Sequence, residues 1–144
     1  MTNGPKKINH VGFAVPNIQT FLKNTAPLYE QFSRGPLITN DRQRVRQMFL
    51  TDGGTTIEFL EPLQDDSPLR GFLNKNRTGG LLHLALEVVD LDAAIGRVTA
   101  AGGRLVVAPV PDVAFQERRI AFVFLGGQIT ELIEVPRQPL ASAP

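Results

Sequence analysis

Bulky and small residues alternate near the start of the chain, over residues 7–15. The bulky side chains fall on one face, and the other face carries small residues and one histidine, His10. A period of two predicts a β-strand, whose bulky face we expect to lie under helices. The small face, with its histidine, suits the floor of a cleft. Asn17 is the expected cap of a helix that begins at Ile18 and is interrupted at Pro27.

The following segments predict three strands. They are expected near residues 37–40, 42–50 and 55–61, the last two joined by a hairpin at Gly53-Gly54. In the middle strand, Arg42, Arg44 and Arg46 would share one face. They could form a cationic wall for a substrate carboxylate or phosphate. A solvated edge strand that charge keeps from aggregating is the favoured interpretation.

A helix is predicted to link the two halves of the chain. It is expected over residues 67–77, with Ser67 as its cap and Pro68 in its first helical position. Gly79-Gly80 ends it.

The strand-to-helix pattern then begins again at residues 82–91. His83 opens this strand, and Asp90 or Asp92 can cap the helix that follows. Further strands are expected near residues 104–108, 119–125 and 128–135, with a loop over 109–116 and a hairpin at Gly126-Gly127.

Two unlike landmarks repeat at the same distance along the chain. The only two histidines, His10 and His83, are 73 residues apart, and so are Glu58 and Glu131. A shared offset indicates a duplicated module. We therefore predict an α+β fold of two βαβββ modules that form a curled mixed sheet around a metal cleft. The domain limits are residues 7–62 for module one, 67–77 for the linker helix and 81–136 for module two, with a flexible tail over 137–144.

Composition narrows the possible functions. The chain has 144 residues, a net charge of +1 and no cysteine, which suits one domain and excludes disulfides and thiolate metal sites. The charge gives no argument for nucleic acid or a membrane surface. No apolar run approaches the roughly 20 residues of a membrane span, so we expect a soluble, cytoplasmic protein.

The residues that repeat are metal-ligand types. His10, Glu58, His83 and Glu131 could hold one divalent ion such as Co²⁺, Ni²⁺, Mn²⁺, Fe²⁺ or Zn²⁺. Such an ion would act as a Lewis acid and stabilise an enediolate. Glu61 and Glu134 repeat at the same offset, and residues three apart in a strand face opposite ways. Only one glutamate of each pair can therefore face the cleft, and the alternation of the strand does not decide whether Glu131 or Glu134 is the ligand.

The two module openings, HVGFAVPNI and HLALEVVDL, resemble those of the vicinal oxygen chelate superfamily, which includes glyoxalases, bleomycin-resistance proteins and dioxygenases. Residues 55–94 are most similar to the methylmalonyl-CoA epimerase family. The resemblance implies paired βαβββ modules. Its metal ligands would fall on His10, Glu58, His83 and Glu131, which favours Glu131 over Glu134.

The chain departs from that family in three places. Leu82 stands where the family has the first of two histidines, and the last hairpin is reduced to Gly126-Gly127. Bacterial epimerases carry a catalytic glutamate where this chain has Arg46 or Gln47. The resemblance then implies Glu131 as a ligand that doubles as the base, with Glu58 second, and Gln47 or Arg46 orienting or neutralising the substrate.

The leading functional hypothesis is a metal-dependent isomerase or lyase that acts on a small carbonyl substrate, such as a CoA thioester, and resembles methylmalonyl-CoA epimerase. Its alternatives are a glyoxalase I-like lactoylglutathione lyase and a small-molecule binding protein without chemistry. A ring-cleaving dioxygenase ranks lowest, because that class has histidine where Glu58 stands. A homodimer is also expected.

Overall fold

The computed structural model describes residue 5 and residues 7–136. The tail expected over 137–144 lies outside the described residues. Module one contains β1 (Lys7–Ala14), α1 (Ile18–Asn24), α2 (Ala26–Tyr29), β2 (Ser33–Arg34), β3 (Ile38–Asn40), β4 (Val45–Thr51) and β5 (Thr56–Pro62). Module two follows the linker helix α3 (Leu69–Lys75) and contains β6 (Gly80–Val88), α4 (Leu91–Ala100), β7 (Arg104–Asp112), a short 3-10 helix (Val113–Phe115), β8 (Arg118–Leu125) and β9 (Gln128–Glu134).

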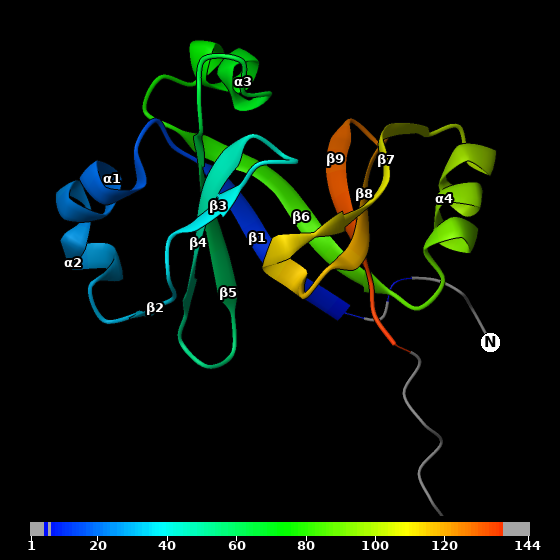
Figure 1. The fold of residues 1–144 in the computed structure, drawn as a ribbon, viewed down its shortest axis with the longest axis horizontal. Helices are drawn as coiled ribbons and strands as arrows, with labels where there is room; N and C mark the ends of the chain where they lie inside the picture. The colour runs from blue at the N-terminus through cyan, green and yellow to red at the C-terminus, as the bar shows by residue number, and fades with distance from the viewer. Residues whose placement is uncertain (1–4, 6, 137–144) are drawn as a thin grey trace, which may run out of the picture.

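The strands form one mixed sheet. Its order is β2-β4-β5-β1-β6-β9-β8-β7, and β3 pairs with β4 beside this path. The two modules join where β1 and β6 pair antiparallel, and within each module the first strand pairs in parallel with the last, β1 with β5 and β6 with β9. The sheet curls, with α1 and α2 beyond one end and α4 beyond the other (Figure 1). The predicted α+β fold with a curled mixed sheet is confirmed.

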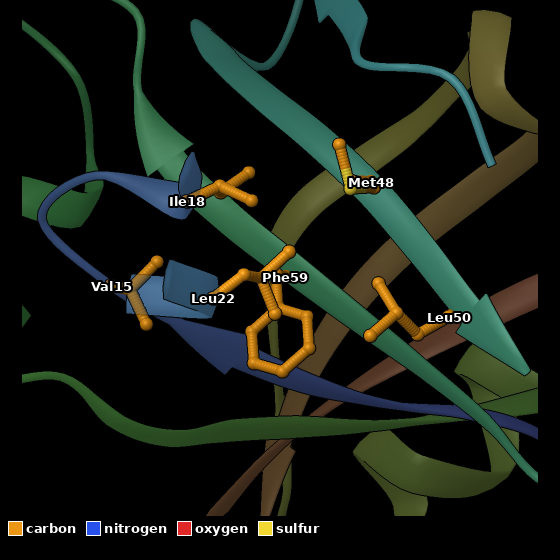
Figure 2. Close-up of a cluster of buried hydrophobic side chains, with 6 residues drawn as sticks. All are labelled: Val15, Ile18, Leu22, Met48, Leu50 and Phe59. Atoms are coloured by element: carbon orange, nitrogen blue, oxygen red, sulfur yellow. The ribbon is translucent and has the colours of Figure 1, made fainter. Parts of the chain in front are cut away.

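Helices cover the outer face of each half of the sheet. In module one, the bulky side chains of the strands meet the inner side of α1 in a buried cluster (Figure 2), formed by Val15, Ile18, Leu22, Met48, Leu50 and Phe59. A matching cluster in module two packs α4 against β8 and β9. The alternation of the strands therefore sends apolar residues to the helices and leaves the opposite face for the site. None of the described helices is long and apolar enough to cross a membrane.

The helix caps follow the sequence signals closely. Asn17 accepts a hydrogen bond from the Thr20 N–H at 2.9 Å, and Asp90 accepts one from the Ala93 N–H at 3.0 Å, so the Asp90 alternative is the correct one. The linker helix begins one residue later than expected, at Leu69. Pro68, rather than Ser67, occupies the cap position. The Ser67 hydroxyl accepts a hydrogen bond from the Leu69 N–H at 3.3 Å.

Two expectations for the strands are wrong. Arg42 and Arg44 lie in a turn before β4, where Arg44 has a positive φ of 58°, so they do not share a strand face with Arg46. The segment predicted as a loop continues β7 as far as Asp112, which pairs with Arg118 in β8. The prolines that indicated a loop are tolerated because β7 is an edge strand and needs fewer backbone donors.

A buried carboxylate anchors the first helix to the sheet. Oε1 of Glu61 accepts the Ile18 N–H at 2.9 Å, and its Oε2 lies 3.2 Å from the guanidinium of Arg46. The negative charge sits at the positive end of the helix dipole.

Module two repeats this arrangement 73 residues later. Glu134 accepts the Leu91 N–H at 3.0 Å and pairs with Arg119 at 3.0 Å. The Arg119 guanidinium holds the pKa of the Glu134 carboxyl below its usual range. Glu61 and Glu134 thus join helix to sheet, and the duplication extends to these contacts.

We expect Glu61→Ala to lower the free energy of unfolding by about 1–3 kcal/mol, because it removes a charged hydrogen bond to a helix N-terminus and leaves Arg46 without its partner. Chemical denaturation of this variant and of a control at the exposed Glu30, Glu30→Ala, measures the difference. Equal stability of the two variants would contradict the anchoring role.

Candidate metal centre

Four side chains converge at the junction of the two modules. His10 comes from β1, Glu58 from β5, His83 from β6 and Glu131 from β9. All four are buried, with 1–3% of their surface exposed.

The strand register explains why these residues meet. Gly12 pairs with His83 on β6 and with Glu58 on β5. In the other module, Ala85 pairs with His10 on β1 and with Glu131 on β9. Each small residue thus has a histidine on one side and a glutamate on the other, and the four long side chains rise from the same face of the sheet.

The distances between donor atoms suit a single ion. Nε2 of His10 lies 3.2 Å from Oε1 of Glu58, 3.3 Å from Oε1 of Glu131 and 3.3 Å from Nε2 of His83. Nε2 of His83 lies 3.5 and 3.3 Å from the same two oxygens. Ligands about 2 Å from one ion are separated by roughly 3–3.5 Å. In addition, Oε1 of Glu58 is buried without a hydrogen-bond partner. The group could therefore bind a metal ion.

Polar neighbours orient the ligands. Nδ1 of His10 lies 2.7 Å from the side-chain oxygen of Asn9, whose amide donates to Glu87 at 2.9 Å. The amide of Gln47 donates to Oε2 of Glu58. Such contacts fix the direction in which a ligand presents its donor atom.

Aromatic rings close the sides of the cluster. Phe49 meets the ring of His10 edge-on with centroids 5.6 Å apart, and Phe122 meets His83 in the same way at 5.4 Å. Phe115 stacks on the ring of His10 with centroids 5.7 Å apart, and it also lies beside Phe49, 5.8 Å away. These rings exclude water, which strengthens the electrostatic interactions among the four polar groups.

The structure separates the expected catalytic residues. Gln47 and Glu131 lie at the cluster, whereas Arg46 projects from the other face of β4 and pairs with Glu61. Adjacent residues of a strand point to opposite faces, so Arg46 and Gln47 could not both face the cleft. Glu134 likewise points away, toward the start of α4.

A cavity of about 160 Å³ opens beside the cluster and is lined mainly by apolar side chains. Glu58, His83 and Glu131 reach its wall, together with Asn40 and Asp112. Sequence reasoning missed these last two residues. Asp112 fell in the segment expected to be a loop, and no motif marks Asn40.

Interactions within the cluster shift the pKa values of its two histidines and of Glu58. Burial opposes charging of the imidazoles, but Glu131 and Glu58 outweigh it and raise the pKa of His10 to about 10 and that of His83 to about 9. Burial also opposes ionisation of Glu58, yet the two histidines lower its pKa to about 2. Without a metal, the cluster therefore holds protons on its imidazoles at neutral pH.

The metal-free and metal-bound proteins should respond to pH in opposite ways. In the metal-free protein, stabilisation by the raised pKa of His10 and His83 is complete below about pH 6.5 and is lost as the pH rises toward 9–10. Glu58 does not change over this interval, because its lowered pKa matters only below about pH 4.5. Metal binding needs neutral imidazoles and strengthens as the pH rises.

Thermal unfolding with a chelator and with a divalent ion, each at about pH 6 and about pH 8.5, measures this difference. We expect Tm to fall with pH in the first case, and the stabilisation by metal to grow with pH in the second. A stabilisation by metal that does not change with pH would argue against imidazole ligands.

Gly12 provides the space for His83. A Cβ at this position would lie 2.5–2.8 Å from three atoms of the His83 ring. We expect Gly12→Ala to displace the ring and weaken metal binding by about 10–100-fold, as loss of ligand orientation does elsewhere. Calorimetric titration with Ni²⁺ measures the affinity. Gly96→Ala is the matched control, because a Cβ there meets nothing within 4 Å. Wild-type affinity in Gly12→Ala would contradict this account.

Comparison with known proteins places this geometry in a family. Residues 9–122 match the model of the Glyoxalase/Bleomycin resistance protein/Dioxygenase superfamily. The chain is 32% identical over 132 residues to the ethylmalonyl-CoA/methylmalonyl-CoA epimerase of Cereibacter sphaeroides, covering 90% of this chain and 98% of that protein.

Solved structures give the same result. Methylmalonyl-CoA epimerase from Mycobacterium tuberculosis superposes with a TM-score of 0.78 at 30% identity, covering 99% of this chain and 96% of that chain. A variant of the Streptomyces coelicolor methylmalonyl-CoA epimerase, in complex with 2-nitronate-propionyl-CoA, superposes with a TM-score of 0.76 at 26% identity, covering 93% and 100%. The resemblance drawn from the sequence is confirmed: the chain belongs to the glyoxalase/bleomycin resistance protein/dioxygenase superfamily, and these three relatives are epimerases of methylmalonyl-CoA.

Proposed function

We propose that this protein is a metal-dependent epimerase of a methylmalonyl-type CoA thioester. The observation that carries the proposal is the convergence of four buried donor groups at the wall of a cavity. It occurs in a chain that matches an epimerase over 98% of that enzyme's length.

One divalent ion would be held by His10, Glu58, His83 and Glu131. Two imidazoles and two carboxylates suit Co²⁺, Ni²⁺, Mn²⁺ or Zn²⁺. The ion would supply a Lewis acid for the carbonyl oxygen of the substrate. The rest of the chemistry is proton transfer by the protein.

Glu131 is the proposed base that also serves as a ligand. It is buried and lines the cavity in which a substrate would bind. Glu58 is the weaker candidate because the Gln47 amide already occupies its second oxygen. Gln47 would hold Glu58 in place, while Arg46, paired with Glu61 on the other face, has no proposed role in the reaction.

A glyoxalase-like lyase would use the same donor set on a hemithioacetal, and a binding protein would not need the donors at all. Four buried, converging donors favour a metalloenzyme, because imidazole and carboxylate groups are ligands for divalent ions and a binding protein has no need to bury them together. The homodimer and the cytoplasmic location stay predictions. Light scattering after size-exclusion chromatography tests the dimer, and cell fractionation tests the location.

The proposed function is tested by stripping the protein of metal, reloading it with each divalent ion and counting bound ions by elemental mass spectrometry. Inversion and deuterium uptake at C2 of methylmalonyl-CoA are then followed in heavy water. We expect the wild type to bind about one ion per chain. His83→Ala should bind no ion, and its activity should be lower by a factor of at least about 100. Glu61→Ala, on the same strand as Glu58 but facing the helix, should keep its ion.

Other outcomes separate the alternatives. Bound metal with turnover of a hemithioacetal, and none of methylmalonyl-CoA, would assign the lyase reaction. Absence of bound metal after every reload would overturn the enzyme proposal and favour the binding protein.

A further inference from the structure

Inversion at a single carbon requires two proton-transfer groups. A proton leaves one face of the carbon and another arrives on the opposite face, so one base and one acid must both reach it. Glu131 can supply one of these groups. On β4, the polar residue directed toward the cluster is Gln47, whose amide is not a base.

The cavity offers one further carboxylate. Among the described residues that line it, the acidic ones are Glu58, Glu131 and Asp112. The first two belong to the donor cluster, and Asp112 does not. Asp112 is therefore the carboxylate that stays available for proton transfer.

The surroundings of Asp112 hold it rigidly. It ends β7 and is 3% exposed. Its Oδ1 accepts the Ala114 N–H at 2.8 Å and the Asn40 amide at 3.1 Å. Within residues 7–136, both of these side-chain hydrogen bonds go to Oδ1, which leaves Oδ2 as the oxygen for a substrate proton.

Asn40 also connects Asp112 to the donor cluster. The Asn40 amide donates to the side-chain oxygen of Gln47 at 2.8 Å, and Gln47 donates to Glu58. This chain of buried side chains fixes the position of Asp112 relative to the cluster across the two modules. Locked side chains are what a proton-transfer site requires.

The electrostatic environment suits the same role. Burial raises the pKa of Asp112, although hydrogen bonds from Ala114 and Asn40 oppose the shift. A carboxylate with a raised pKa accepts a proton more effectively near neutral pH.

We propose that Asp112 is the second proton-transfer residue of the epimerase, acting on the face of the substrate carbon opposite to Glu131. The inference rests on the proposed function. In one direction, the Asp112 carboxylate takes the C2 proton, and the electron pair of the C–H bond moves to the thioester carbonyl oxygen as an enolate. The protonated Glu131 then gives its proton to the other face of C2. The reverse direction exchanges the two roles.

The test uses the metal-loaded full chain and each C2 epimer of methylmalonyl-CoA separately, in heavy water. Asp112→Asn keeps the Oδ1 acceptor for Ala114 and Asn40, and it should keep its metal. We expect inversion to fall at least about 100-fold, while one epimer still exchanges its C2 proton for deuterium through Glu131 without inversion. Glu117→Gln removes a neighbouring, exposed carboxylate and should invert both epimers like the wild type.

Three outcomes would overturn the inference. Inversion by Asp112→Asn at the wild-type rate would remove any role in proton transfer. Equal loss of exchange from both epimers, with metal still bound, would make Asp112 a positioning residue. If the wild type neither exchanges nor inverts, the proposed epimerase function fails first, and the role of Asp112 falls with it.

Discussion

The close pairing of β1 and β6 is the constraint on which the site depends. It brings the two histidine strands side by side, and His83 has room for its ring because Gly12 carries no side chain. The parallel partners β5 and β9 then place Glu58 and Glu131 next to the histidines. A shift of one residue in this register would turn one set of ligands to the opposite face of the sheet.

Each module has one strand with two glutamates on opposite faces: one glutamate joins the donor cluster and the other binds a helix. Glu58 and Glu131 face the cluster, while Glu61 and Glu134 bind the backbone at the start of a helix and an arginine. Residues three apart in a strand point in opposite directions, so neither glutamate can replace the other. The helix that covers the core and the cluster beneath the sheet are therefore held by the same short strand.

The 73-residue repeat accounts for the cluster of four donor groups, whereas the other polar residues of the cavity wall do not follow this repeat. The ligands and their aromatic neighbours Phe49 and Phe122 repeat at the 73-residue offset. The polar chain of Asp112, Asn40 and Gln47 does not, since the positions related to the last two are Val113 and Ile120. A symmetric cluster suits a central ion. Proton transfer at the two faces of one carbon, in contrast, needs a separate acid or base on each face, which an asymmetric cavity wall can supply.

The sequence alone predicted the strands and helices with clear periodicity, the cap at Asn17, the repeat and the four donor residues, because each depends on local pattern or on spacing; it left the second cap open between Asp90 and Asp92, which the structure decides for Asp90. It did not determine that β7 reaches Asp112, since the edge position that tolerates its prolines exists only in the assembled sheet. Nor could it separate Arg46 from Gln47, whose directions depend on which face of β4 the helices cover. The link from Asp112 through Asn40 to Gln47 joins residues 72 and 7 positions apart. Contacts of this kind are created by tertiary packing and leave no periodic signal in the chain.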